Sequence, residues 1–302
     1  MIVSVSELKH RYGERTALAG ISFDVPEGCI FSLLGPNGGG KSTLFRILAT
    51  VMAPTAGLAT VAGFDVTSQS AQVRRLVGVV FQSQSLDRKL TAGENLHAQG
   101  HFYGIYGAQL RDRIREVTAR LHLDTRVHDV VGNLSGGLRR RVEIAKALLH
   151  RPRVLLMDEP STGLDPAARR ELWQYIADLR SMGNVTVLLT THILDEADRA
   201  DQLALLHQGR IVASGTPVEL KARVGGDVVM LESADPGGLA ASIQSRFGVR
   251  AAASGTTLRV EIANGHRFIA EVVEAFPGAI QSVALHKPTL EDVFLDETGA
   301  AL

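Results

Sequence analysis

The distribution of apolar and polar residues predicts three β-strands within the first 34 residues. The segments "IVSVSEL" and "ISFDV" alternate apolar and polar positions and are rich in β-branched residues, which is typical of half-buried strands. The segment "CIFSLL" is a short apolar run, the pattern of a strand that is buried on both faces. A glycine-rich loop then leads into the helical pattern of "KSTLFRILATVM". The chain therefore starts with strands and enters its first helix through glycines.

The middle of the chain alternates strand-like and helical segments. Apolar strands are predicted in "RVLLMDEP" and "VTVLLTTH", and the segment between them, "PAARRELWQYIADLRSMG", has helical periodicity. Residues 91–150 contain no strand pattern and are predicted to form a helical insert. Apolar strands that alternate with helices form parallel sheets covered on both faces, so we predict an α/β fold with a helical subdomain.

A domain boundary is predicted near residues 221–227, where the sequence reads "KARVGGD". The remainder reads as strand, helix, two strands, helix and strand, which is the ferredoxin-like order. The segment "KPTLEDVFLDETG" closes it with a short helix for which Thr289 is the expected N-cap. We therefore predict one domain over residues 1–220, with a helical subdomain at about 91–150, and a small accessory α+β domain over residues 221–302.

Composition narrows the classes of function. The 302 residues are 45% hydrophobic and 21% charged, which is ordinary for a globular chain of about two domains. The 32 basic and 32 acidic residues balance, so the broad positive charge of a nucleic-acid-binding protein is absent. The single cysteine, Cys29, excludes an intrachain disulfide and is interpreted as a small buried side chain. We find neither a signal-peptide pattern nor an apolar run of ~18 residues, so a membrane process would need another chain.

The segment "GPNGGGKST" matches the phosphate-loop pattern G-x-x-x-x-G-K-[ST] and lies between a predicted strand and a predicted helix. Glycines let backbone N–H groups point inward at phosphates, and the helix N-terminus adds partial positive charge. Lys41 is expected to reach the β- and γ-phosphates, and the Ser42 hydroxyl to bind Mg²⁺. The predicted ATP-binding residues of this loop are Gly35, Pro36, Asn37, Gly38, Gly39, Gly40, Lys41, Ser42 and Thr43.

Two adjacent carboxylates, Asp158 and Glu159, end the apolar strand in "VLLMDEP". Sheets of this class bind ligands outside the carboxyl ends of their strands. Because neighbouring residues on a strand point to opposite faces, the two carboxylates need not share a role. Asp158 suits the Mg²⁺ shell, and Glu159 suits the activation of a water molecule.

Taken together, the motifs resemble those of the ATP-binding subunits of ABC transporters, which are P-loop NTPases. The segments "GPNGGGKST", "LSGG", "VLLMDEP", "STGLDP" and "TTH" occur in that family's order and spacing over roughly residues 2–220. Tyr12 stands where the family has an aromatic residue that stacks on adenine. The segments "SLDRKLTAGENL" and "KPTLEDVFL", together with Leu138 after the signature, resemble the daunorubicin-resistance and nodulation-factor-export group.

The resemblance implies an ATPase that pairs head to tail with a second copy of itself. Each ATP would lie between the phosphate loop of one copy and the signature residues of the other, Ser135, Gly136 and Gly137. Ser135 can cap a helix that begins near Leu138, and that helix N-terminus would face the γ-phosphate. Asp165 would couple the two sites across the dimer. A separate membrane permease would hold the ATPase at the cytoplasmic face of the membrane and carry out export.

The resemblance also assigns the chemistry of hydrolysis. Glu159 would be the general base, and His192 in "TTH" would contact the γ-phosphate and support the attacking water. Lys41 would complete the catalytic set. Gln82 in "VVFQ" would bind Mg²⁺, beside Ser42 and Asp158, or the water, and would sense the membrane subunit. The implied ligands are therefore ATP and Mg²⁺.

Several features leave alternatives open. Gly39 stands where the family commonly has alanine, and Leu138, where many members have glutamine, has a side chain that makes no hydrogen bond. The arginines at positions 139–141 are interpreted as mainly a solvated helix face, of which one could pair across the dimer. The aromatic residues of the helical insert are interpreted as core, with a groove for a permease helix as the alternative: Phe102, Tyr103 and Tyr106.

The alternative function is a soluble ABC-type ATPase that is not tied to transport and works on ribosomes or DNA. The single phosphate loop argues against the ribosomal type, which has two cassettes in one chain. The segment between Gln82 and Leu134 is short and lacks sustained heptads, which argues against the DNA-associated type. A binding or regulatory protein with a dead ATPase site is disfavoured by the intact Lys41, Asp158, Glu159 and His192. No nucleic-acid partner is expected.

Overall fold

The computed structural model describes residues 1–182 and 185–300. The chain divides into two compact units, Met1–Ser214 and Gly215–Leu302, and each is described by itself. The predicted boundary after residue 220 falls inside helix α8 (Pro217–Arg223). Because α8 begins with a Thr216–Glu219 capping box and packs against helix α11 of the second unit, the division lies several residues earlier than predicted.

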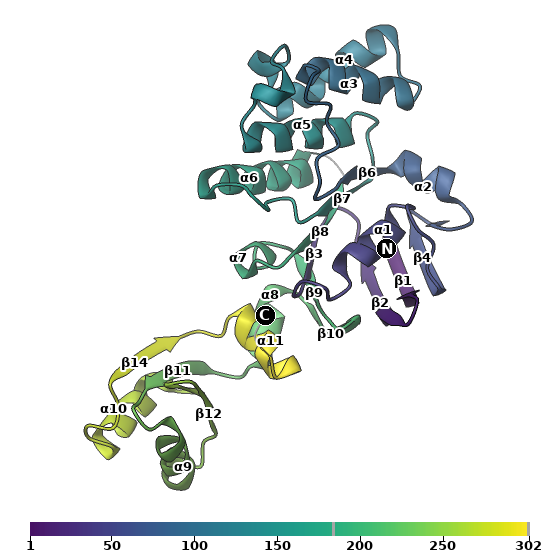
Figure 1. Ribbon diagram of the computed structural model, residues 1–302. Helices are drawn as coiled ribbons and strands as arrows, with labels where there is room; N and C mark the ends of the chain where they lie inside the picture. Colours follow the sequence, from purple (N-terminus) through teal and green to yellow (C-terminus); the bar gives the residue numbers. More distant parts are fainter. Residues whose placement is uncertain (183–184, 301–302) are drawn as a thin grey trace. The chain divides into compact units, whose positions relative to one another are not determined.

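A six-stranded sheet forms the centre of the first unit, with the strand order β10-β9-β3-β8-β7-β6 (Figure 1). Its members are β3 (Ile30–Leu34), β6 (Val77–Val80), β7 (Val154–Asp158), β8 (Thr186–Thr191), β9 (Gln202–His207) and β10 (Arg210–Gly215). Strand β3 pairs in parallel with β8 and β9, and β7 pairs in parallel with β6 and β8. The predicted parallel core is confirmed.

Apolar clusters cover both faces of this sheet. Along β7, Val154 and Leu156 belong to one cluster, whereas Leu155 and Met157 belong to the other. The first cluster includes helix α1 (Lys41–Leu48) and a second sheet, which is antiparallel and has the order β2-β1-β4-β5. The strands of that sheet are β1 (Val3–Tyr12), β2 (Arg15–Val25), β4 (Ala56–Val61) and β5 (Phe64–Asp65). Because its apolar side chains alternate, β7 lies between two apolar layers, one on each face of the sheet.

Helices form the other cluster, on the face of the sheet away from α1. They are α3 (Ala92–Phe102), α4 (Gly107–Arg120), α5 (Gly136–Leu148) and α6 (Pro166–Met182), with two short 3-10 turns at Asp124–Arg126 and Val131–Asn133. Two further short helices are α2 (Ser70–Leu76) and α7 (Leu194–Ala197). Residues 91–150 thus form helices and turns with one isolated β-bridge between Thr91 and Val130. No helix in the described part of the chain is long and apolar enough to cross a membrane.

The aromatic residues of the helical insert lie outside the core, so that prediction is wrong. Phe102 is 86% exposed and Tyr106 is 60% exposed. They lie at the turn between α3 and α4, away from the α4 face that carries the buried Leu110 and Ile114. Tyr103 stacks on His150 with ring centroids 3.9 Å apart. These aromatic side chains therefore belong to the surface of the insert.

The second unit has its own antiparallel sheet, with the order β12-β13-β11-β14. Its elements follow the order strand, helix, two strands, helix and strand: β11 (Asp227–Glu232), α9 (Pro236–Phe247), β12 (Ala251–Ser254), β13 (Thr257–Ile262), α10 (Gly265–Ala275) and β14 (Ser282–His286). Its core includes Leu231, Ile243 and Phe268. Helix α11 (Leu290–Thr298) follows, with Thr289 and Asp292 forming a capping box. This is the element order that the sequence predicts.

Candidate functional site

The loop between β3 and α1 has glycines where the backbone leaves no room for a side chain. A Cβ atom added to Gly35 would lie 2.1 Å from the carbonyl oxygen of Leu206. Gly40 has a φ of 109°, and an added Cβ would lie 2.5 Å from the carbonyl oxygen of Ala17. At Gly39 the tightest approach would be 3.1 Å, to the carbonyl oxygen of Pro36. The loop borders a cavity of about 320 Å³ whose lining includes Lys41, Ser42 and Thr43.

Lys41 is a buried ammonium at the start of α1. Its Nζ atom donates to the carbonyl oxygens of Gly35, at 2.6 Å, and Pro36, at 3.1 Å. It also lies 3.5 Å from the Oε1 atom of Glu159. Burial lowers the pKa of Lys41, and the nearby Glu159 and Asp158 oppose that shift. A buried cation with carbonyl partners at the loop is well placed to exchange them for phosphate oxygens.

Asp158 and Glu159 both face the phosphate loop, contrary to the expectation that they point to opposite faces. The Asp158 carboxylate accepts from Thr190 Oγ1 at 2.6 Å and from Ser42 Oγ at 3.4 Å. Glu159 follows the end of β7 and has a φ of 44°, so the alternation of a strand does not apply to it. Its backbone N–H donates to Thr190 Oγ1 at 3.0 Å. Thr190 therefore helps to fix both acidic residues.

The Glu159 carboxylate brings together residues from three other segments of the chain. Gln82 Nε2 donates to Glu159 Oε2 at 3.3 Å, and His192 Nδ1 lies 3.4 Å from the same oxygen. Thr162 Oγ1 also donates to that oxygen, at 3.2 Å. Sequence reasoning had missed Thr162, for which the only signal is a hydroxyl three residues after the carboxylate. Lys41, Gln82, Glu159 and His192 thus meet in one place, at the carboxyl ends of the strands.

Tyr12 lies at the end of β1 and lines the same cavity as Lys41. The residue is 43% exposed, and its hydroxyl lies 3.5 Å from Thr43 Oγ1. An exposed aromatic ring beside a phosphate loop offers a flat apolar face to a base. Arg15 and Arg46 also line the cavity, and the sequence carried no signal for either. This part of the site is cationic and open.

The signature residues start helix α5 and lie apart from the Lys41 cavity. Ser135 is the N-cap, and its Oγ atom accepts from Leu138 N at 3.3 Å. The helix begins at Gly136, two residues before the predicted start, because Ser135 already has N-cap geometry. An added Cβ at Gly136 would meet only Leu164, at 3.8 Å. Nothing in the described part of this chain therefore requires a glycine at position 136.

The three arginines that follow the signature are not a solvated face, so that prediction is wrong. Arg140 is 3% exposed and donates to the carbonyl oxygen of Phe81 at 2.8 Å. Arg139 donates to the carbonyl oxygen of Leu134 at 2.6 Å, and Arg141 pairs with Glu171. Leu138 packs against the apolar cluster of the helical face. Each of these side chains has a partner within its own chain.

Asp165 caps helix α6. Its Oδ1 atom accepts from the backbone N–H groups of Ala167 and Ala168, each at 2.9 Å. These bonds, chiefly the one from Ala168, hold the pKa of Asp165 below its usual value. The side chain is exposed and lies on the loop that follows Glu159 and Thr162.

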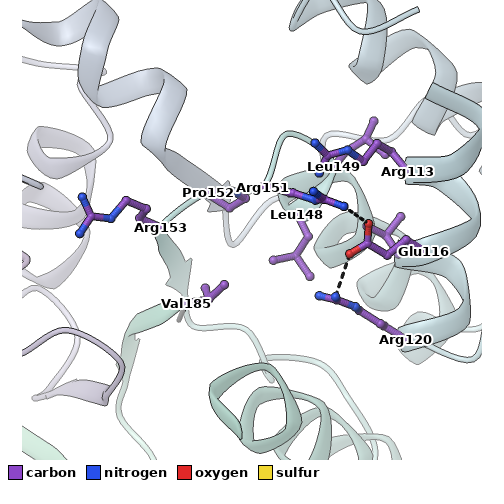
Figure 2. Close-up of a pocket in the computed structure, with 10 residues that line it drawn as sticks. Arg113, Glu116, Arg120, Leu148, Leu149, Arg151, Pro152, Arg153 and Val185 are labelled. Atoms are coloured by element: carbon purple, nitrogen blue, oxygen red, sulfur yellow. Dashed lines mark hydrogen bonds and ion pairs between the residues drawn. The ribbon is translucent and has the colours of Figure 1, made fainter. Parts of the chain in front are cut away.

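A second cavity, of about 380 Å³, lies at the opposite end of the strands (Figure 2). Its lining includes Arg153 and Val185, which directly precede β7 and β8. Glu116 accepts from Arg120 at 2.7 Å and from Arg151 at 2.8 Å, so the carboxylate holds two of the arginines (Figure 2). Ligands of such sheets bind at the carboxyl ends of the strands, which makes this cavity a poor candidate for the active site.

Comparisons with known proteins agree with this geometry. The family described as "ABC transporter" matches residues 18–162. The chain is 38% identical to daunorubicin resistance ATP-binding protein DrrA3 of Streptomyces coeruleorubidus, over 98% of this chain and 96% of that one. It is 39% identical to Nod factor export ATP-binding protein I of Ralstonia nicotianae, over 99% of this chain and 94% of that one.

Solved structures show the same fold. An ATP-binding subunit of an ABC transporter matches with a TM-score of 0.66 at 29% identity, over 74% of this chain and 94% of that one. A dimeric ATP-binding cassette in a post-hydrolysis state, bound to ADP and phosphate, matches with a TM-score of 0.64 at 27% identity. That match covers 71% of this chain and 98% of the other.

Proposed function

Because this chain belongs to the ATP-binding subunits of ABC transporters, and is an ATPase of that family, we propose that it powers a membrane exporter through ATP-dependent head-to-tail dimerisation. The observation that carries the proposal is the Glu159 carboxylate, which has Lys41, Gln82 and His192 around it at the phosphate loop. The sequence has a single match to the phosphate-loop pattern, at residues 35–42, and these groups converge on it.

ATP binds along the cavity between Tyr12 and the phosphate loop. Lys41 leaves the carbonyl oxygens of Gly35 and Pro36 and turns to the β- and γ-phosphates, which replaces neutral acceptors with charged ones. The backbone N–H groups of the loop and the N-terminus of α1 stabilise the same negative charge. Tyr12 offers its exposed face to the adenine ring.

The residues present also suit Mg²⁺. Ser42 Oγ and Asp158 Oδ1 lie 3.4 Å apart and are hard oxygen ligands. The side-chain amide of Gln82 donates to Glu159, the residue next to Asp158. When bound, Mg²⁺ would neutralise charge that develops on the β- and γ-phosphate oxygens. Ser42, Asp158 and Gln82 would hold it, and Thr190 keeps Asp158 oriented through its 2.6 Å hydrogen bond.

Glu159 removes a proton from the water that attacks the γ-phosphate. Its carboxylate is buried yet keeps hydrogen bonds from Gln82 and Thr162, so it is fixed before substrate arrives. His192, which is half-buried beside the same oxygen, contacts the γ-phosphate and supports that water. The products are ADP and phosphate.

The second half of each site comes from another copy of the chain. Ser135 is exposed at the start of α5, and Gly136 has no packing requirement within its own chain. A glycine at a helix N-terminus lets an anion approach the backbone N–H groups of positions 136 and 137. Asp165, on the exposed loop after Glu159, couples the two sites across the dimer. A solved relative in a post-hydrolysis state is a dimer, which supports this arrangement.

A separate permease supplies the path through the membrane and holds the ATPase dimer at its cytoplasmic face. The relatives are named for drug resistance and Nod factor export, which supports export as the direction of transport. Phe102 and Tyr106 form an exposed aromatic surface on the helical insert that suits a permease segment. The C-terminal unit is proposed as an accessory domain that stabilises the dimer or contacts the permease. Removing residues 225–302 should therefore weaken dimerisation, complex assembly or transport.

The decisive experiment replaces the general base. Glu159→Gln should leave ATP binding intact and lower turnover by roughly 10²-fold or more, the scale of losing a general base. It should also trap an ATP-dependent dimer that size-exclusion chromatography detects. Glu171→Gln is the matched control, because that exposed carboxylate lies on α6 and pairs with Arg141. Near-normal turnover of Glu159→Gln would remove Glu159 from its role.

A further inference from the structure

The loop that carries Gln82 is held at both ends by helix α5. At the first end, Arg140 Nη1 donates to the carbonyl oxygen of Phe81 at 2.8 Å. At the second end, Glu143 Oε1 accepts from the backbone N–H of Ser85 at 2.6 Å. Lys146 Nζ donates to Ser85 O at 2.8 Å and to Ser85 Oγ at 2.7 Å. Residues 81–85 therefore form an arch between two anchors on one helix.

The three anchoring side chains share one face of α5. Arg140, Glu143 and Lys146 are spaced by three residues, which places them side by side along a helix. Arg140 is 3% exposed and Glu143 is 2% exposed. Burial lowers the pKa of Arg140, whereas Glu143 and Asp158 oppose that shift. Charged side chains are costly to bury unless they have partners. Here the partners of the buried Arg140 and Glu143 are backbone atoms of the loop at residues 81–85.

Gln82 lies between the anchors and reaches the general base. Its Nε2 atom donates to Glu159 Oε2 at 3.3 Å. The side chain of Phe81 adds to the first anchor, because its ring packs edge-on against Phe45 with centroids 5.8 Å apart. The intervening residues of the arch are exposed and have no core packing of their own. The direction of the Gln82 side chain therefore depends on where α5 holds the loop.

We propose that Arg140, Glu143 and Lys146 are positioning residues that hold Gln82 against Glu159. The same helix starts at Ser135, the residue assigned to the nucleotide of the partner copy. The arch therefore connects the helix that starts at the signature with the general base of the same chain. The inference rests on the proposed function, because it assigns a role to Gln82 in hydrolysis.

The test is a double-mutant cycle between the second anchor and Gln82. Glu143→Ala should lower kcat by about 10-fold, the fold-change that corresponds to ~1.4 kcal/mol of coupling, and leave KM for ATP within a factor of about two. In the Gln82→Ala background, Glu143→Ala should cause little further loss. If Gln82→Ala lowers turnover and Glu143→Ala lowers it by a further tenfold in that background, the two losses are additive. That result would overturn the inference and leave the proposed function standing. A Gln82→Ala protein with full turnover would instead remove Gln82 from the proposed function.

Matched variants separate positioning from folding. Glu143→Gln keeps an acceptor for Ser85 N–H and should restore most of the lost turnover, whereas Arg141→Ala, the neighbour that contacts exposed Glu171, should keep normal turnover. Lys146→Met keeps the apolar stem of a half-buried side chain and should lower kcat as Glu143→Ala does. It takes the place of Glu143→Ala in the test if that variant does not fold. Binding of a fluorescent ATP analogue should stay unchanged in all of them. Equal losses in Arg141→Ala and Lys146→Met would overturn the proposal.

Discussion

The two proposed half-sites of this chain are built in opposite ways. The phosphate-loop half-site is enclosed by its own chain: Lys41 and Glu159 are buried and partnered, and Gly35 has no space for a side chain. The signature half-site faces outward: Ser135 is exposed, and a side chain at Gly136 would make only an ordinary contact. A glycine that its own chain does not require points to a requirement from outside. The contrast supports a site that is completed by a second copy.

The largest expected effect comes from placing a methyl group in the enclosed half-site. In Gly35→Ala the new Cβ would lie 2.1 Å from a backbone oxygen, so the loop must move. We expect affinity for ATP to fall by ~10- to 10²-fold, because displaced backbone N–H groups lose hydrogen bonds to the phosphates that are each worth ~1.5–3 kcal/mol. The matched variant Gly39→Ala meets its neighbours at 3.1 and 3.3 Å and should change affinity by less than about threefold. Titration with a fluorescent ATP analogue and thermal unfolding measure both; similar losses in the two variants would contradict the contrast.

A negative charge in the outward-facing half-site should stabilise the folded chain slightly and yet lower its turnover. Gly136→Asp puts a carboxylate in the first turn of α5, which favours the helix by ~0.3–1 kcal/mol. The same carboxylate would face the γ-phosphate of the partner copy, and like charges in contact cost several kcal/mol, so turnover should fall by at least ~10²-fold. ATP binding to the separate chain should not change.

The control for that variant is another exposed helix start. Ala108→Asp adds the same charge to the first turn of α4, far along the sequence from the signature. It should leave turnover and ATP-dependent dimerisation as they are. If Ala108→Asp and Gly136→Asp slow hydrolysis equally, the signature half-site has no special relation to nucleotide.

The sequence predicted the local elements better than the directions in which side chains point. The phosphate-loop pattern, the apolar strands and the capping residues Ser135 and Thr289 are local signals, and the structure places each of these elements where the sequence suggested. Glu159 shows the limit of such signals. Its φ of 44° turns the carboxylate toward Lys41, and strand alternation predicts the opposite face.

Non-local partners explain what the sequence could not predict. Three consecutive arginines on a helix face three directions, and nothing local says that the middle one, Arg140, meets Phe81, a residue far away in the sequence. Phe102 and Tyr106 look like core residues by composition, yet they lie at the turn where α3 ends. Exposure of this kind depends on where the helices end relative to their neighbours.

Mixing two inactive variants should restore part of the activity if the half-sites combine in trans. Lys41→Ala removes the phosphate-loop half-site, and Gly136→Asp removes the signature half-site. A mixed dimer keeps one complete site, formed by the intact halves of its two chains. An equal mixture should therefore recover about a quarter of wild-type turnover, since half of the dimers are mixed and each has one of two sites. A mixture that stays as inactive as its components would argue against head-to-tail pairing.

The finest test uses the chemical difference between a buried and an exposed thiol. Cys29 is the only cysteine, and burial, assisted by Asp201, raises the pKa of its thiol to about 11. At pH 8 only ~0.1% of it is the reactive thiolate, so the folded protein should resist maleimide. Ser135→Cys adds an exposed thiol at a helix N-terminus, which lowers its pKa and makes it react much faster. Labelling should rise with pH from the new thiol alone.

ATP should then protect the new thiol only when the dimer closes. In a Glu159→Gln background, ATP at about ten times its dissociation constant should slow labelling at position 135 by roughly tenfold, because only the open fraction reacts. ADP should protect less, since it lacks the γ-phosphate that the signature is proposed to contact. Cys29 serves as the internal reference, because its burial belongs to the single chain and does not depend on dimerisation. Equal protection by ADP and ATP would mean that the outward-facing half-site does not contact the γ-phosphate.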